Sequence, residues 1–203
     1  DLDALPGAVR AGIADTLALY TDKPPKGSAH NWGRKALLRW QDLLRDPKAK
    51  GSWDTVLSSD EALLAGLTTA YKYAFLFWKD ESETADRGLF ADFLDEAADI
   101  LDNSGLRDAS TEFRTSAETW KRLSRALLPD EHAVLAKTRE LLHRRHAAFL
   151  SKGSVAFEEM RAIDNDLAEL GGFELSESDR RRLLDGVAEG VSQVEAAETA
   201  AIA

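Results

Sequence analysis

The sequence predicts an all-α fold, a single bundle or orthogonal array of about eight helices. Apolar residues recur at steps of three and four along most of the chain, which is the spacing of one buried helix face. No segment alternates apolar and polar residues over a useful length, and Val and Ile are sparse. Short polar stretches containing Gly, Pro, Asn or Ser separate the periodic segments, as expected for loops between helices.

Two helices are predicted near the N-terminus. The first spans Leu5 to Tyr20 and ends before Pro24-Pro25, because proline cannot continue a helix. The second begins after a polar and aromatic junction, where we expect Asn31 to cap the helix and Trp32 to pack over the core as a hydrophobic staple. This helix is predicted to end near Asp46-Pro47.

The middle of the chain is predicted to hold two helices separated by a loop. A capping box of Ser58 and Glu61 opens an aromatic-rich helix that runs to Trp78. The stretch from Lys79 to Asp86 is mostly charged and has no apolar stripe, so we expect a solvated loop. The next helix covers Arg87 to Leu101, with apolar residues on one side and carboxylates on the other.

Four more helices are predicted in the C-terminal half. They cover Leu106–Leu128, Asp130–Gly153, Ser154–Leu170 and Ser176–Ala201. Asp130, Ser154 and Ser176 stand at the starts of the last three, where a side-chain oxygen can accept hydrogen bonds from free backbone amides. A chain of 203 residues can bury one core, so we expect a single helical domain over residues 1–203.

Composition excludes several classes of partner and chemistry. A formal net charge of −10 disfavours a nucleic acid or an anionic membrane held by bulk electrostatics. No apolar run approaches the roughly 20 residues that span a bilayer, so we expect no membrane segment and a cytoplasmic protein. The chain has no cysteine, which removes disulfides, thiolate metal sites and a cysteine nucleophile from this sequence.

Two groups of side chains resemble metal sites, but neither is complete. Asp92, Asp95, Glu96 and Asp99 share one helix face, as in aspartate-rich magnesium sites, yet no second acidic helix accompanies them. Glu140 and His143 have the Glu-x-x-His spacing of half a di-iron site, and no second copy exists. We interpret both groups as exposed helix faces and expect neither a metal nor another cofactor.

One junction gathers several chemically useful side chains. The residues from His30 to Arg34 place a possible acid or base, an amide, an aromatic ring and a cation where a loop meets a helix. A plain helix entry explains the same residues, so both interpretations stay open. No serine lies in a nucleophile-elbow pattern and no glycine-rich phosphate loop occurs, so no catalytic residue is recognised in this chain.

Several motifs, in order along nearly the whole chain, resemble one family. They are Trp32-Gly33-Arg34-Lys35-Ala36-Leu37 with Trp40, Arg45-Asp46-Pro47-Lys48, Gly51-Ser52-Trp53, Arg87 with Phe90-Ala91-Asp92-Phe93-Leu94-Asp95-Glu96-Ala97-Ala98, Phe113-Arg114 with Trp120, Leu127-Leu128-Pro129, Phe173-x-Leu175-Ser176, and Glu195-Ala196-Ala197-Glu198. This pattern is similar to the helical C-terminal domain of proteins related to butirosin biosynthesis protein H. That domain has no assigned activity of its own, and the Phe-Leu-Asp-Glu-Ala-Ala core is the most specific part of the resemblance.

The resemblance implies a longer, two-domain protein in bacterial secondary metabolism. Its N-terminal domain would resemble a papain-type or bacteriocin-peptidase-like cysteine domain, with the catalytic Cys and His upstream of Asp1. The butirosin protein moves an aminoacyl group from a carrier protein to an aminoglycoside amine. Family members often carry a glycine-rich stretch before the arginine of the Phe-Leu motif, whereas this chain has Asp80 to Asp86 there.

Two hypotheses about function follow. In the first, the chain is the accessory half of a cysteine-dependent acyltransferase or amidase, with the upstream domain and an acyl carrier protein as partners. The residues proposed to meet substrate or the other domain are His30, Trp32, Arg34, Arg87 and Phe90. In the second, the chain is a stand-alone helical interaction module without catalytic activity, either a homo-oligomer or a docking surface.

Overall fold

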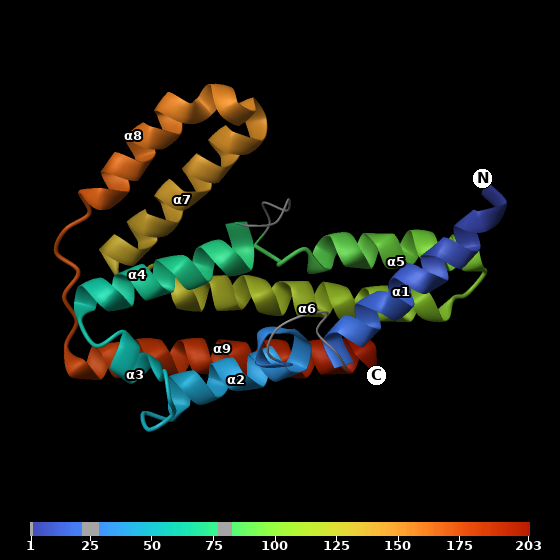
Figure 1. The fold of residues 1–203 in the computed structure, drawn as a ribbon, viewed down its shortest axis with the longest axis horizontal. Coiled ribbons are helices and arrows are strands. Elements are labelled where there is room, and N and C mark those ends of the chain that lie inside the picture. The colour runs from blue at the N-terminus through green and yellow to red at the C-terminus, as the bar shows by residue number, and fades with distance from the viewer. Residues whose placement is uncertain (1, 22–28, 77–82) are drawn as a thin grey trace.

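The computed structural model describes residues 2–21, 29–76 and 83–203 (Figure 1). Across these three ranges the regular elements are all helical, without a strand, which confirms the all-α prediction. The eight longer α-helices are α1 (Leu5–Thr21), α2 (Gly33–Arg45), α4 (Asp60–Tyr71), α5 (Arg87–Leu101), α6 (Gly105–Leu127), α7 (Ala133–Lys152), α8 (Phe157–Ala168) and α9 (Glu177–Ile202). Shorter elements are α3 (Trp53–Val56), the π-helix η3 (Lys72–Leu76) and the 3-10 turns η1 (Leu2–Ala4), η2 (Ala29–Asn31) and η4 (Gly153–Ala156).

Helices α6 and α9 form the centre of the fold. They pack along each other, with α5 on α6 and α2 on α9 (Figure 1). The seam is built from apolar residues at helical spacing, among them Leu123 and Leu127 of α6 and Val187 and Val191 of α9, all fully buried. Gly190 permits the close approach, because a Cβ atom there would lie 2.9 Å from Leu123 Cδ1.

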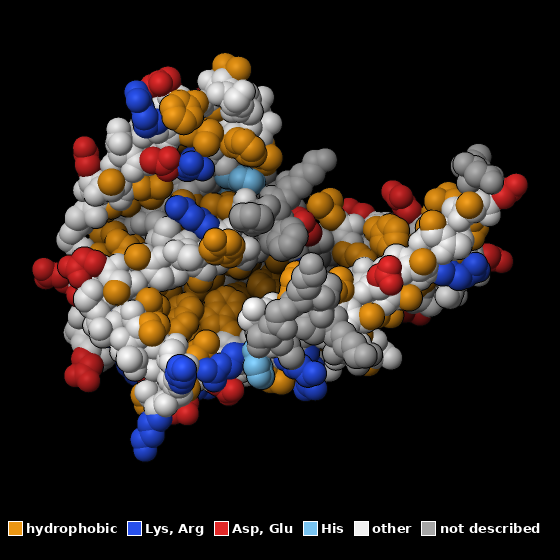
Figure 2. Space-filling model, viewed as in Figure 1, with side chains coloured by type: hydrophobic (Ala, Val, Ile, Leu, Met, Phe, Trp, Pro, Cys, Tyr) orange, Lys and Arg blue, Asp and Glu red, His pale blue; other side chains and the backbone are white. Residues whose placement is uncertain are grey.

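The α7–α8 hairpin stands off from this centre. Helices α7 and α8 pack on each other, and α7 reaches the rest of the molecule through α4 and η3 (Figure 1). The end of the hairpin carries exposed hydrophobic side chains (Figure 2), among them Phe149, Leu150, Val155 and Phe157. One face of α7 therefore lies beside the body of the molecule while the far end of the hairpin is free of it.

A second, smaller apolar cluster lies where α5, α6 and the end of α9 meet. Phe90 packs edge-to-face against Phe113, with ring centroids 4.7 Å apart, and lies 5.7 Å from the ring of Phe93. Leu94 and Ala201 complete the cluster. Phe90, one of the residues proposed from the sequence to meet substrate or another domain, is thus half-buried in this packing.

The start of α2 differs from the prediction. The N-cap position is Trp32, without a side-chain cap, whereas Asn31 lies in the preceding 3-10 turn. Trp32 is 44% exposed, so it does not cover the core as a staple. Gly33 has a φ of 54° and lies against the backbone of Tyr20, where a Cβ atom would clash. Close packing of α2 on α1, rather than a capping side chain, therefore determines the junction.

Three other predicted caps are wrong and one is confirmed. The cap of α4 is Ser59 instead of Ser58, and its Oγ accepts from the Ala62 amide at 3.1 Å. Helix α7 starts after His132 and α8 after Ala156, so neither Asp130 nor Ser154 caps a helix. Ser176 does cap α9, accepting from the Asp179 amide at 3.1 Å. None of the helices described here is long and apolar enough to cross a membrane.

Candidate functional site

The described part of the segment before α5 is buried at residues 83–85, where the sequence predicts a solvated loop. Residues 79–82 lie outside the described residues, but Glu83, Thr84 and Ala85 are only 4%, 7% and 5% exposed. Charge in the sequence indicated solvent, and the structure instead provides protein partners for the one carboxylate in this part of the segment. A buried carboxylate needs such partners, because burial without them is very unfavourable.

The backbone of this segment is strained. Glu83, Ala85 and Asp86 have φ values of 63°, 50° and 61°, in the left-handed region that residues with a Cβ rarely adopt. Each such conformation costs on the order of 1–2 kcal/mol and persists only where surrounding contacts hold it. Glycine would adopt this conformation without strain, and none of the three residues is glycine.

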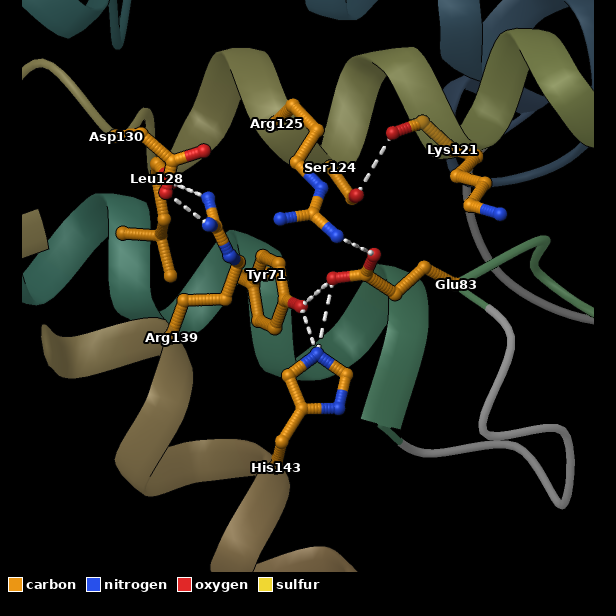
Figure 3. Close-up of polar contacts among 9 residues, drawn as sticks. All are labelled: Tyr71, Glu83, Lys121, Ser124, Arg125, Leu128, Asp130, Arg139 and His143. Atoms are coloured by element: carbon orange, nitrogen blue, oxygen red, sulfur yellow. Dashed lines mark hydrogen bonds and ion pairs between the residues drawn. The ribbon is translucent and has the colours of Figure 1, made fainter. Parts of the chain in front are cut away.

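Glu83 lies at the centre of a polar cluster that joins four parts of the chain (Figure 3). The Tyr71 hydroxyl at the end of α4 donates to Glu83 Oε1. His143 Nε2 on α7 lies 2.9 Å from the same oxygen and 2.6 Å from the Tyr71 hydroxyl. Arg125 Nη2 on α6 lies 3.3 Å from Glu83 Oε2. The cluster therefore ties the segment before α5 to three helices at once.

These contacts fix the protonation states of the cluster. Burial by itself would raise the pKa of Glu83, but hydrogen bonds from His143 and Tyr71, together with the nearby Arg125 charge, lower it to about 2. Burial and the adjacent Glu83 carboxylate raise the pKa of Tyr71 far above its usual value. Glu83 is thus ionised and Tyr71 protonated across the neutral pH range, so neither is adjusted for proton transfer near pH 7.

A pocket of about 420 Å³ opens beside this cluster, between α6 and α7. Its basic wall consists of Lys121 and Arg125 on α6 and Arg139 and His143 on α7, each pair four residues apart on its helix. Its acidic residues are Glu83 and Glu140, and the rest of the lining is Ala136. The pocket therefore brings four basic side chains together in a chain whose formal net charge is −10.

Arg139 has a structural role in this wall. Its guanidinium is buried and donates to the Leu128 carbonyl at the end of α6 and to the Asp130 carboxylate (Figure 3). These bonds satisfy a carbonyl that the end of the helix leaves free. Asp130, predicted as a helix cap, acts instead as the partner of Arg139.

Arg87, proposed from the sequence as an interface residue, belongs to a different buried cluster. Its Nε lies 2.6 Å from Glu198 Oε1, its Nη1 donates to the Ala85 carbonyl at 2.7 Å, and its Cζ is 5.2 Å from the centre of the Trp120 ring. The Trp120 indole donates to the same Glu198 oxygen at 2.7 Å. The guanidinium is therefore used to hold α5, α6 and α9 together.

The other proposed residues lie at the start of α2. Arg34 Nε lies 2.5 Å from Glu195 Oε1 on α9, one turn before Glu198. His30 and Trp32 are exposed beside it. The two proposed arginines thus meet neighbouring turns of α9, but each is paired with its own carboxylate instead of sharing a ligand.

The acidic face of α5 pairs with α6. Arg114 lies 2.9 Å from Asp92 and 2.7 Å from Asp95, and Arg107 lies 2.5 Å from Asp99. Within the described ranges, no group of three or more His, Asp or Glu side chains is placed to hold a metal ion. Half-exposed ion pairs of this kind contribute little to stability individually.

Sequence reasoning missed the Glu83 cluster. His143 was interpreted as an exposed helix residue and Glu83 as part of a solvated loop, because the two are 60 positions apart and neither lies in a recognisable motif. One signal was present in the sequence, since Arg139 and His143 share a face of α7 with four-residue spacing. Without the fold, that face could not be matched to Glu83 or Tyr71.

Comparison with known families gives one match. A model of a domain of unknown function (DUF4872) matches residues 86–148, which include α5, α6 and most of α7. The matched segment contains Arg87 and the four basic residues of the pocket, whereas Tyr71 and Glu83 precede it. No curated protein and no solved structure matches the chain.

Proposed function

We propose that this chain is the accessory helical domain of a cysteine-dependent acyltransferase or amidase related to butirosin biosynthesis protein H. In this role it packs against an upstream catalytic domain and forms one wall of the substrate cleft, while an acyl carrier protein delivers the acyl group. The match to a domain of unknown function over residues 86–148 supports the proposal, since it covers the Phe-Leu-Asp-Glu-Ala-Ala motif that is most specific in the resemblance.

The chemistry of the described residues favours an accessory role over a catalytic one. Among the described residues, the buried charged side chains Glu83, Arg139 and Glu198 are paired, and the pKa values of Glu83 and Tyr71 are displaced away from neutrality. A general acid or base works best with a pKa near the operating pH. The reaction therefore depends, in this proposal, on a cysteine supplied by the other domain.

The start of α2 is our proposed contact with that domain. Trp32 is 44% exposed beside the exposed His30, and a large aromatic ring of this kind is a common anchor at protein interfaces. Arg34 and Arg87 contribute to the proposed contact indirectly, because they pair with Glu195 and Glu198 on α9. Phe90 acts through its packing on Phe113.

A second candidate function is a stand-alone interaction module. The observation that favours it is the end of the α7–α8 hairpin, where Val155 and Phe157 are 85% and 63% exposed next to Phe149 and Leu150. Exposed apolar side chains gathered in one place commonly mark a protein contact. The two candidates therefore assign the interface to different ends of the molecule.

The coding sequence that precedes Asp1 provides the first test. We expect it to encode a domain with a Cys followed by a distant His, and we expect the two parts, expressed together, to co-purify and to transfer an acyl group from a carrier protein to an amine. Trp32→Ala should weaken co-purification about tenfold, as loss of an interface anchor does. Phe157→Ala, which removes an exposed aromatic ring from the hairpin, is the matched control.

The outcomes separate the two candidates. An upstream sequence without such a domain would remove the accessory role and leave the interaction module. Self-association or partner binding lost in Phe157→Ala but retained in Trp32→Ala would likewise place the interface on the hairpin.

A further inference from the structure

We propose that the pocket between α6 and α7 binds a phosphate group carried by a small molecule. Its basic side chains come from two facing helices, Lys121 and Arg125 from α6 and Arg139 and His143 from α7 (Figure 3). Because residues four apart on a helix share a face, Lys121 and Arg125 point their charges toward the same space. This site does not depend on the proposed acyltransferase role.

The two acidic residues of the pocket are already engaged. Glu83 receives hydrogen bonds from Tyr71 and His143 through one oxygen and an ion pair from Arg125 through the other. Glu140 is held by Lys137, whose Nζ lies 2.8 and 2.9 Å from its two oxygens and which is not part of the pocket lining. Glu140 is therefore neutralised by a residue outside the pocket lining, and Glu83 is paired with Arg125 and His143 but not with Lys121.

Lys121 is the cation that the fold uses least. Its backbone carbonyl accepts from Ser124, but its ammonium has no hydrogen bond or ion pair with any residue that the structure describes (Figure 3). Arg125 is half-exposed and pairs with Glu83 through one of its three nitrogens at 3.3 Å. The remaining N–H groups of Arg125 can donate to a second acceptor, since the guanidinium carries five donors.

The chemistry of these donors favours phosphate. A guanidinium provides a planar fork of donors and an ammonium a compact point charge, and together they match the several oxygens of a phosphate. The volume of about 420 Å³ is much larger than one phosphate group and lies in the range of small-molecule pockets. We therefore assign the site to a phosphate monoester whose organic part extends from the anion.

The backbone of residues 83–86 supports a binding role for this place. Glu83 lines the pocket in a left-handed conformation, as do Ala85 and Asp86 in the following residues, and strain of this kind is concentrated at ligand sites. Arg87 donates to the Ala85 carbonyl at 2.7 Å. This contact helps to hold the backbone that carries Glu83, the partner of Arg125.

The test uses inorganic phosphate with the whole chain. Binding is measured by isothermal titration calorimetry at pH 7.5 and constant ionic strength, with chloride replacing phosphate in the reference titration. We expect saturable binding to the wild type and about tenfold weaker binding to Lys121→Gln, because one charge-assisted hydrogen bond to phosphate is lost. Lys121 is exposed, so this variant should fold as the wild type does.

A matched control comes from the next residue of the same helix. Arg122 is exposed, donates to Thr119 at 2.8 Å and does not line the pocket. Arg122→Gln removes the same charge and should bind phosphate as the wild type does. Arg125→Lys keeps the charge and removes the donor fork, so we expect binding several-fold weaker than in the wild type.

The proposal fails if phosphate gives no saturable heat in the wild type. It also fails if Lys121→Gln and Arg122→Gln weaken binding equally, because the effect would then come from overall charge and not from the pocket. Sulfate with the same affinity as phosphate would assign the pocket to tetrahedral oxyanions in general and overturn its assignment to phosphate monoesters.

Discussion

The molecule contains two buried glutamates with similar partners and different surroundings. Glu83 is 4% exposed and Glu198 is 2% exposed. Each accepts a hydrogen bond from an aromatic side chain, Tyr71 in one case and the Trp120 indole in the other, and each pairs with an arginine. Both thus satisfy the general requirement that a buried carboxylate be paired and hydrogen-bonded.

The two arginines show the difference. Arg87 lies over the Trp120 ring, donates to the Ala85 carbonyl and is 31% exposed, so it is part of the packing. Arg125 is 50% exposed, pairs with Glu83 at the longer distance of 3.3 Å and borders a pocket. The same combination of Glu, Arg and aromatic residue therefore holds helices together at one place and lines an open site at the other.

The two clusters are connected through the fold. The ring of Tyr71 lies 5.2 Å from Phe75, and Phe75 lies edge-to-face on Trp120 at 6.0 Å. The segment from Glu83 to Arg87 joins them along the chain. A change in the buried cluster around Glu198 can therefore alter the cluster around Glu83 and the pocket beside it. We call the Glu198 cluster the sealed cluster and the Glu83 cluster the open cluster.

The largest expected effect comes from removing the carboxylate of the sealed cluster. Glu198→Ala leaves the Arg87 guanidinium and the Trp120 indole without their shared acceptor. We expect the free energy of unfolding to fall by about 4 kcal/mol, because breaking a buried ion pair from one side leaves an uncompensated charge. Urea unfolding followed by tryptophan fluorescence and circular dichroism measures this loss.

The control for that variant is on the same helix, one turn earlier. Glu195 pairs with Arg34, whose side chain is 53% exposed and can be solvated when its partner is removed. Glu195→Ala should therefore cost about 1 kcal/mol or less. Equal losses in the two variants would show that burial does not distinguish the two ion pairs, and the structural importance assigned to Arg87 would have to be withdrawn.

The helices were predictable from the sequence because their evidence is local. Apolar spacing of three and four located all eight longer helices, and Ser176 was identified as a cap from its position before α9. Predicted caps failed where a neighbouring element decides the boundary. At α2 the close contact of Gly33 with Tyr20 sets the helix start, and at α7 Asp130 is taken by Arg139.

The pocket was not predictable because its residues come from three separate segments, the stretch before α5 and helices α6 and α7. A charged stretch such as residues 79–86 normally indicates solvent, and no local pattern reveals that Glu83 finds Tyr71, Arg125 and His143. Arg87 shows the opposite error. Its position at the start of α5 suggested an interface residue, but in the fold it pairs with the buried Glu198. In both cases the partner lies far away in the sequence, and this partner determines whether the charged side chain is buried in the packing or lines the pocket.

The second largest expected effect is a loss of stability in acid, which comes from Glu83 in the open cluster. The pKa of Glu83 is about 2 in the folded protein, below its ordinary value of 4.5 in an unfolded chain. Because the folded-state pKa is the lower one, the ionised carboxylate stabilises the fold above pH 4.5, and this contribution is lost as the pH falls toward 2. Its full size is about 3 kcal/mol at about 1.4 kcal/mol per pKa unit.

Glu83→Gln cannot titrate and isolates this contribution. The difference in unfolding free energy between the wild type and Glu83→Gln should decrease by about 3 kcal/mol between pH 6 and pH 2. Urea unfolding at pH 6, 4, 3 and 2 measures it, and other carboxylates cancel because both proteins carry them. A difference that stays constant with pH would mean that Tyr71 and His143 do not hold the ionised form.

The smallest expected effect concerns a single hydroxyl of the open cluster. Tyr71→Phe keeps the ring and its contact with Phe75 but removes the donor to Glu83. We expect a loss of about 1 kcal/mol at pH 7, the usual net value of one hydrogen bond, and a higher pKa for Glu83.

A double-mutant cycle with Glu83→Gln shows whether that loss belongs to the cluster. The two residues share one hydrogen bond, so the double variant should be more stable than the sum of the single losses implies, with a coupling energy of about 1 kcal/mol. Additive losses would mean that the hydroxyl acts outside the Glu83 contact. Phe75 adjoins the Tyr71 ring and packs on Trp120. Unchanged tryptophan bands in the near-ultraviolet circular dichroism of Tyr71→Phe would therefore show that the aromatic packing between the two clusters is intact, so that the loss arises from the hydrogen bond.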